Sequence, residues 1–176
     1  MARTWGTTGA ERAEPFPCDR HLAPPFEEAY RAIDVAAPAP VVFRRLCQLR
    51  VAPYSYDWLD NFGRRSPREL TPGLERLEVG QRFITIFELV EFETDDHVTI
   101  RVRRAKGVFG DVAVTYRVRP AGAGGTRLTV KLVCRRRGPG PVARLYGAAL
   151  PWGDLAMMRK QLRTLRDLAE RDNRVR

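Results

Sequence analysis

The stretch from Asp154 to Arg171 has the clearest helical pattern in the sequence. Its apolar residues recur at spacings of three and four, as on one face of an α-helix, and they are Leu155, Met158, Leu162, Leu165 and Ala169. The opposite face carries Arg159, Arg163, Arg166 and Glu170. Such a helix is roughly 25 Å long, about the width of five or six strands set about 4.8 Å apart. The pattern therefore predicts a long helix lying across a sheet, with the functional space between the two.

Three stretches before this helix alternate apolar and polar residues with the period of two that β-strands have: 98–103, 111–118 and 128–135. In each stretch one face is apolar and the other carries charged residues or threonine, which predicts an antiparallel sheet wetted on one side. The glycine-rich segment 121–125 is predicted to be a hairpin loop. The run 81–93 is apolar at both parities, so its orientation in the sheet stays open.

The N-terminal part of the chain predicts a different organisation. Residues 1–28 hold four prolines and no apolar period, which indicates an irregular arm that Trp5 and Phe16 pin to the domain of residues 29–176. A first strand over 30–36 is followed by two predicted short helices, over 41–49 and 55–63. Near the other end, Pro151 is expected to separate a short helical piece from the long helix, because proline cannot continue the hydrogen-bond ladder.

This order of elements predicts an α+β fold in which a curved antiparallel sheet wraps around a long C-terminal helix, with two short helices after the first strand. A single helix about 10 Å in diameter cannot fill the concave side of a wide curved sheet. We therefore expect an apolar cavity between the sheet and the helix, of the kind that binds small molecules.

Length and composition limit the alternatives. A chain of 176 residues with 44 % hydrophobic content fits one domain, and neither a signal peptide nor a membrane-spanning run is apparent, so we expect a cytoplasmic monomer or homodimer without membrane insertion. The three widely spaced cysteines suggest reduced thiols rather than disulfides. The sequence has only two histidines, His21 and His97, so we expect no metal site and no cofactor. His97 is predicted to be an exposed turn residue beside Asp95 and Asp96.

The net charge of +10 raises the question of nucleic acid. The paired and tripled arginines lie in different predicted elements and lack the interleaved aromatics of single-strand-binding surfaces. Basic charge alone supports only non-specific attraction to phosphates. We therefore expect a solvated basic surface and no specific nucleic-acid site, while a basic-surface interaction protein remains an alternative.

The segment from Tyr54 to Asn61 concentrates aromatic and polar groups on one short predicted helix. One interpretation is a packing plug whose tyrosine hydroxyls bond to the backbone, and the other is the lining of a pocket mouth. Tyr56 and Asp57 are the candidates for a catalytic role. A carboxylate in the first turn of a helix is, however, more often a cap than a general base.

The sequence resembles the START-like (SRPBCC) helix-grip superfamily, in the branch described as polyketide cyclase/dehydrase and lipid transport. The most specific match is 54–61, and further matches are Trp5 to Thr8, Ile33 to Pro38 followed by Val42 and Phe43, and the hairpin from Val118 to Leu128. The branch often has tryptophan in its first helix, where this chain has Phe43. The resemblance implies a cavity for a hydrophobic small molecule and does not imply one reaction.

Two functions are compatible with such a cavity. The first is binding of a lipid-like or polyketide-like molecule, and the second is polyketide aromatase/cyclase or dehydratase activity in the same cavity. No motif for an activated nucleophile or a phosphate loop is present. The residues expected to contact the ligand are Tyr54, Tyr56, Asp57, Trp58, Phe87, Tyr116, Trp152, Met158 and Leu162.

Overall fold

The computed structural model describes residues 3–56, 58, 63–104, 110–135 and 141–175, and only the backbone of residues 123 and 141–151. The described strands are β1 (Thr4–Trp5), β2 (Glu27–Val35), β3 (Arg82–Phe83), β4 (Phe87–Glu93), β5 (His97–Val102), β6 (Asp111–Ala121) and β7 (Gly125–Arg135). The described helices are α1 (Gly9–Ala13), η1 (Pro17–His21), α2 (Ala39–Cys47), η2 (Gln48–Arg50), η3 (Gly122–Gly124) and α5 (Pro141–Arg174). These strands form one seven-stranded sheet in the order β1-β2-β7-β6-β5-β4-β3.

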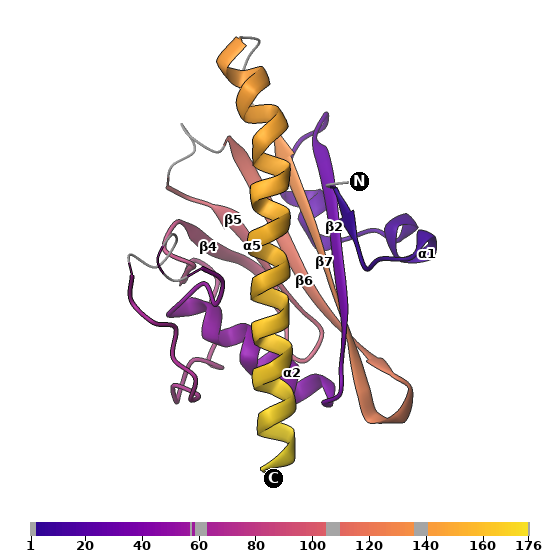
Figure 1. The fold of residues 1–176 in the computed structure, drawn as a ribbon, viewed down its shortest axis with the longest axis vertical. Helices are drawn as coiled ribbons and strands as arrows, with labels where there is room; N and C mark the ends of the chain where they lie inside the picture. Colours follow the sequence, from indigo (N-terminus) through magenta and orange to yellow (C-terminus); the bar gives the residue numbers. More distant parts are fainter. Residues whose placement is uncertain (1–2, 57, 59–62, 105–109, 136–140, 176) are drawn as a thin grey trace.

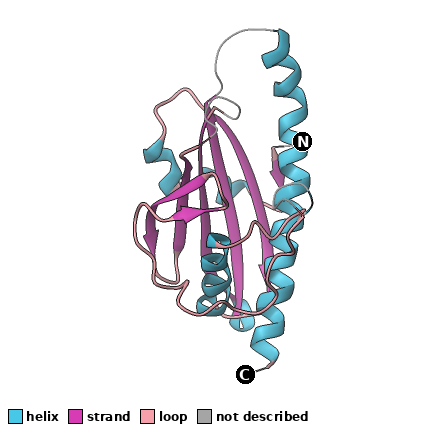
Figure 2. Ribbon diagram, turned by 90° about the vertical axis from the view of Figure 1, so that its left-hand side faces the viewer, coloured by secondary structure: helices cyan, strands magenta, loops and turns pink. Residues whose placement is uncertain are grey.

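The sheet lies between two layers. Helix α5 runs along one face, together with α2, while α1 lies on the far side of β2 from α5 (Figure 1). In the view turned by 90°, α5 and the sheet stand side by side as separate layers (Figure 2). We call the face toward α5 the inner face and the face toward η1 the outer face. This arrangement confirms the predicted α+β helix-grip fold.

The inner face follows the predicted alternation. The apolar positions of β5, β6 and β7 pack with α2 and α5 in one core cluster, which includes Val98, Ile100, Val114, Tyr116, Val118, Leu128, Val130, Leu162 and Leu165. Every second side chain of a strand lies on the same face of the sheet. The alternation in the sequence is therefore sufficient to predict which face is buried.

The outer face differs from the prediction of a wetted surface. Thr99 and Thr115 are fully buried there, and Lys131 is 4 % exposed. The cover is the N-terminal segment, since the backbone N–H of Cys18 donates to Thr115 Oγ1 at 2.9 Å and the Lys131 ammonium lies 2.7 Å from the Asp19 carboxylate. Buried polar groups require such partners, and the N-terminal segment supplies them. The prediction of a wetted outer face is therefore wrong where this segment crosses it.

The segment predicted as an irregular arm also contains short regular elements. Strand β1 pairs in parallel with β2, and α1 begins with a capping box in which Thr8 accepts from the Glu11 N–H while the Glu11 carboxylate accepts from the Thr8 N–H. Gly6 has φ of 73°, and a Cβ there would lie 2.2 Å from the carbonyl oxygen of Ala32. Only glycine allows β1 to approach β2 this closely.

The run 81–93 is not one continuous strand. Ile84 and Thr85 have positive φ, and the break separates β3 from β4. Within β4 the register shifts between Leu89 and Glu91, so that Leu89 pairs with Ile100 while Phe92 pairs with Val98. A β-bulge changes which parity faces the core. The break at Ile84 and Thr85 and the bulge after Leu89 together explain why apolar residues occur at both parities of the run.

Helix α5 is longer than predicted and passes through Pro151 without a break. The predicted interruption is therefore wrong. Proline has a helical φ, and its cost inside a helix is about 3 kcal/mol, because it lacks one hydrogen bond and crowds the carbonyl four residues earlier. The helix nevertheless continues on both sides of Pro151. The N-terminal end of α5 extends beyond the sheet (Figure 1). At its other end the Asp172 carboxylate accepts two hydrogen bonds from buried Arg45 of α2, at 2.6 and 2.7 Å.

Two further predictions concern the segment after β2. The short helix predicted over 41–49 is confirmed as α2 followed by η2. Most of the second short helix, predicted over 55–63, lies outside the described residues. Among the helices that the structure does describe, none combines the length and apolar character needed to cross a membrane.

Candidate functional site

The inner side of α5 is covered to different degrees along its length. Leu162, Leu165 and Ala169 are at most 1 % exposed and belong to the core cluster. Met158, one turn earlier, and Leu155, about one further turn away, are only partly buried. The interface between α5 and the sheet is therefore filled around Leu162 to Ala169 and less completely covered around Leu155 to Met158.

A chain of hydrogen-bonded polar groups lies where the inner side of α5 changes from fully to partly buried. The Tyr116 hydroxyl of β6 donates to Gln161 Oε1 at 2.8 Å, and Gln161 Nε2 donates to the Pro53 carbonyl oxygen at 2.7 Å. The Met158 sulfur lies 3.8 Å from the same hydroxyl. This chain links the sheet, α5 and the segment after α2.

A second polar pair lies close by. The Arg31 guanidinium of β2 is 2 % exposed, donates to the Asp154 carboxylate at 2.9 Å and donates to the Arg3 carbonyl oxygen at 2.7 Å. Burial lowers the pKa of Arg31 and raises the pKa of Asp154, and in both groups the attraction between the two charges opposes the effect of burial. The pair therefore joins β2, α5 and the residue before β1 at the half-buried part of the helix.

The Tyr116 phenol remains protonated near neutral pH. Burial raises its pKa, the negative charge of Asp154 adds to this effect, and the hydrogen bond to Gln161 opposes it. A protonated phenol can donate a hydrogen bond to a carbonyl or hydroxyl oxygen, but it cannot act as a base. The arrangement is thus suited to orienting a polar group of a mostly apolar ligand.

The structure brings together part of the predicted site. Tyr116, Met158 and Leu162 lie on facing parts of β6 and α5, and Tyr54 is 1 % exposed in the same core cluster. Phe87 of β4 is partly buried against that cluster.

Other predicted site residues point to solvent. Trp58 is 74 % exposed, Trp152 is 62 % exposed and Tyr56 is 37 % exposed. The two tryptophans are therefore largely in solvent, whereas Tyr56 is partly covered and lies beside α5. Asp57, the other catalytic candidate, lies outside the described residues.

Two open pockets, each of about 410 Å³, lie outside the helix–sheet interface. One is at the C-terminal end of α5, between Arg44 of α2 and Arg171. The other is on the solvent side of α5 and is lined by Tyr56, Lys160 and Arg163. The first pocket mixes the apolar Val41, Leu70 and Val175 with charged residues, whereas the second is lined mostly by charged and polar residues.

Three polar residues of the interior were missed in the sequence: Gln161, Arg31 and Asp154. Gln161 did leave a signal, because it lies three residues after Met158 and four before Leu165, within the apolar stripe of the helix. Arg31 has the parity of Ile33 and Val35, so it also stands at an inward position of its strand. A polar residue at an apolar position of a pattern is a useful indicator of a buried network.

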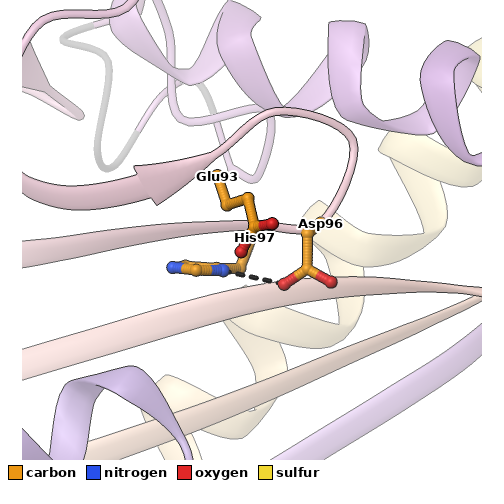
Figure 3. Close-up of side chains that lie close together, drawn as sticks. All are labelled: Glu93, Asp96 and His97. Atoms are coloured by element: carbon orange, nitrogen blue, oxygen red, sulfur yellow. Dashed lines mark hydrogen bonds and ion pairs between the residues drawn. The ribbon is translucent and has the colours of Figure 1, made fainter.

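A cluster of titratable side chains occurs at the turn between β4 and β5. In the part of the chain that the structure describes, Glu93, Asp96 and His97 place potential metal-ligand atoms within 4.8 Å of one another (Figure 3). His97 is 7 % exposed, so its prediction as an exposed turn residue is wrong. Burial lowers its pKa, and the carboxylates of Glu91 and Glu93 oppose this effect. Val118 donates its N–H to the Asp96 carbonyl and holds this turn against β6.

A comparison with protein families finds one match that covers most of the chain. The family described as polyketide cyclase/dehydrase and lipid transport matches residues 27–170. No curated protein matches the sequence significantly.

Solved structures of the same fold are distant in sequence. The di-domain ARO/CYC protein BexL from the BE-7585A biosynthetic pathway has 16 % identity and a TM-score of 0.54, over 82 % of this chain and 46 % of BexL. A Mesorhizobium loti protein has 17 % identity and a TM-score of 0.51, over 82 % of this chain and 98 % of its own. A Thermobifida fusca protein has 16 % identity and a TM-score of 0.51, over 84 % and 94 %. At this level of identity the likeness concerns the fold.

Proposed function

The chain belongs to the polyketide cyclase/dehydrase and lipid transport family, and we propose that it binds a hydrophobic or amphipathic small molecule between α5 and the inner face of the sheet. The observation that carries this proposal is the change in burial along α5. Leu162 is fully buried, whereas Met158, one turn away on the same side, is not. A ligand that enters here replaces water on apolar side chains, which is the main source of affinity for such molecules.

The polar groups at this place favour an amphipathic ligand over a pure hydrocarbon. Tyr116 and Gln161 can hydrogen-bond an oxygen of the ligand, and the partly buried Asp154 with Arg31 offers a charged pair beside them. Met158 supplies an unbranched and polarizable wall that adapts to ligands of different shape. The proposed ligand is therefore lipid-like or polyketide-like, with at least one oxygen function.

Polyketide aromatase/cyclase or dehydratase activity is the second candidate. The specific observation in its favour is the buried phenol of Tyr116 with the amide of Gln161, because such groups can hold a flexible carbonyl-bearing chain in one conformation. In this role the protein accelerates ring closure by orientation, and Tyr116 donates a hydrogen bond to a carbonyl oxygen that gains negative charge.

Native mass spectrometry of the purified protein tests the binding proposal directly. We expect a mass above that of the chain under gentle conditions, released on denaturation and identified as an amphipathic compound. Fatty acids and polycyclic aromatic compounds should then compete with a fluorescent hydrophobic dye for the same site. A folded protein that carries no small molecule and takes up none of these compounds would contradict both candidate functions.

The two candidate functions differ in whether the protein converts a bound molecule into a product. A linear poly-β-ketone analogue incubated with the protein should give one cyclised or dehydrated product faster than in buffer alone if the protein is an enzyme. Tyr116→Phe should slow this reaction more than it weakens binding of the analogue. Binding without any change in product distribution supports the carrier function alone.

A further inference from the structure

The pocket on the solvent side of α5 collects positive charge. Its volume is about 410 Å³, and its charged lining consists of four basic residues and one acidic residue: Arg159, Lys160, Arg163, Arg166 and Asp167. Tyr56, from the segment after α2, and Thr164 add two hydroxyl groups. We call this the basic pocket. Four positive charges and one negative charge leave it with an excess of three positive charges.

Most of this charge is not neutralised by the protein. The Asp167 carboxylate accepts two hydrogen bonds from the neighbouring Arg166, at 2.8 and 3.0 Å. Within the part of the chain that the structure describes, the side chains of Arg159, Lys160 and Arg163 form neither an ion pair nor a hydrogen bond. The Nε atom of Arg159 is also buried without a hydrogen-bond partner. Three cationic side chains of the basic pocket are therefore available to a ligand.

Trp5 of β1 holds two of these cations side by side. The guanidinium carbons of Arg159 and Arg163 lie 5.2 and 5.8 Å from the centre of its ring, which is within cation–π contact. The two arginines are four residues apart, so they are neighbours on one face of the helix. Like charges at this spacing destabilise a helix. An anion bound between the two guanidinium groups would remove this repulsion.

We propose that the basic pocket binds a phosphate group. The planar guanidinium group of arginine donates two parallel hydrogen bonds to phosphate oxygens, and a lysine ammonium adds a point charge. The Tyr56 hydroxyl can donate a further hydrogen bond. A volume of about 410 Å³ is much larger than one phosphate and lies within the range of small-molecule sites. The phosphate therefore belongs to a larger molecule, either a soluble phosphate ester or a lipid with a phosphate headgroup.

The pocket at the C-terminal end of α5 provides a comparison of equal volume. Its charged lining is two arginines, Arg44 and Arg171, and two carboxylates, Glu69 and Asp172. Arg171 lies 3.2 Å from the Glu69 carboxylate and 3.5 Å from that of Asp172. Positive and negative charges therefore balance there, and we expect no preference for anions. The excess of positive charge is a property of the basic pocket and not of every pocket on this basic protein.

The basic pocket is separate from the ligand site proposed above. It lies on the solvent side of α5, whereas the proposed ligand site lies on the inner side, next to the fully buried Leu162. Loss of phosphate binding should therefore leave the uptake of a hydrophobic dye unchanged. The two proposals can fail independently of each other.

Isothermal titration calorimetry with sodium pyrophosphate in physiological salt tests the proposal. We expect one pyrophosphate per chain, because the basic pocket is one site. Arg159→Gln combined with Arg163→Gln should weaken binding at least about tenfold, since each lost charged hydrogen bond is worth 1.5–3 kcal/mol. Arg159→Lys should also weaken binding, because it keeps the charge and loses the planar fork.

A second double variant controls for the change in net charge. Arg68 and Arg82 are exposed and lie outside the basic pocket. Arg68→Gln combined with Arg82→Gln removes the same two charges from the protein, and it should change pyrophosphate affinity by less than about twofold, because salt screens distant surface charges. Circular dichroism and dye uptake check that both double variants are folded.

Sedimentation with lipid vesicles identifies the source of the phosphate. If the ligand is a lipid headgroup, the protein should sediment with phosphatidylcholine vesicles that contain phosphatidic acid, and pyrophosphate should release it. The double variant in Arg159 and Arg163 should then stay in the supernatant. Binding of pyrophosphate without sedimentation supports the same pocket with a soluble phosphate ester as its ligand.

Three results would overturn the proposal. The first is binding of neither pyrophosphate nor vesicles with phosphatidic acid. The second is an equal loss of affinity in the two double variants, which would assign the binding to net charge. The third is displacement of pyrophosphate by a DNA duplex at a lower concentration of phosphate, which would assign the basic pocket to nucleic acid.

Discussion

The guanidinium carbon of Arg117 on β6 lies 4.0 Å from the centre of the Phe16 ring. The same guanidinium donates to the Glu14 carboxylate at 3.0 Å and to the Pro15 carbonyl oxygen at 2.6 Å. Arg117 is 7 % exposed, so its charge is held between the sheet and the N-terminal segment. Contact with the ring and two hydrogen bonds replace the water that the guanidinium loses.

Arg117→Ala should loosen the N-terminal segment and destabilise the protein by about 2 kcal/mol, because it removes the contact with Phe16 and leaves the Pro15 carbonyl without its donor. Urea denaturation measures the loss. Arg82→Ala is the matched control, since Arg82 is exposed on β3, and it should change the unfolding free energy by less than about 0.5 kcal/mol. Equal losses in the two variants would mean that Arg117 does not fix the segment.

Met158→Trp and Leu162→Phe should differ in their effects on stability, although the two residues are neighbours on α5. Leu162 is fully packed, so a larger side chain there should destabilise by about 1–3 kcal/mol. Met158 is only partly buried, so tryptophan should cost less than about 1 kcal/mol and should reduce uptake of a hydrophobic fluorescent dye.

Val79→Trp, at a residue that is 66 % exposed, controls for added bulk and should leave dye uptake unchanged. Thermal unfolding and dye titration give the two readouts. A large destabilisation by Met158→Trp, or unaltered dye uptake, would place the binding space elsewhere.

Tyr116→Phe and Gln161→Leu test the interior hydrogen-bond chain. Tyr116→Phe should destabilise by about 1 kcal/mol, because Gln161 Oε1 loses its donor. Gln161→Leu should cost about 2 kcal/mol, since both the Tyr116 hydroxyl and the Pro53 carbonyl lose their partner. The double variant should lose less than the sum of the single changes, with a coupling energy of about 1 kcal/mol in urea denaturation. Strict additivity would show that the two groups do not depend on each other.

Stability should fall in acid because of Glu11. A hydrogen bond from Arg127 lowers the pKa of the Glu11 carboxyl from 4.5 to about 2, with burial opposing. A carboxyl with a lowered pKa in the folded state stabilises fully above pH 4.5, and this contribution is lost as the pH falls toward 2. Its size is about 2 kcal/mol. Glu11→Gln should therefore flatten the pH dependence of the unfolding free energy between pH 4.5 and 2, and identical slopes in both proteins would contradict this explanation.

Much of the fold followed from local patterns. The period of three and four in 154–171 predicted the inner stripe of α5, and alternation predicted which residues of β5, β6 and β7 face it. Such patterns follow from the backbone geometry of a helix and a strand, which fixes the direction of each side chain within a few residues. The length of α5 was not predictable in this way, because Pro151 signals a break that the structure does not have.

The candidate site was predictable only in part. Tyr116, Met158 and Leu162 stand at apolar positions of strong patterns, and the structure places them in or against one core cluster. Their role in binding stays a prediction. The exposed Trp58 and Trp152 were included because large aromatics are usually buried, although burial depends on whether another segment covers them.

The sequence by itself determined strands β5, β6 and β7, the inner stripe of α5 and the inner face of the sheet, because these depend on residues only a few positions apart in the chain. Only the tertiary structure decided what covers the outer face and which polar groups meet there. Arg117 and Thr115 read as solvent-facing until the segment around Phe16 lies over them, and His21 and His97 are unrelated until both reach Glu91. Contacts between distant segments leave no periodic trace in the sequence, since they arise from the packing of whole elements and not from the backbone geometry of any one of them.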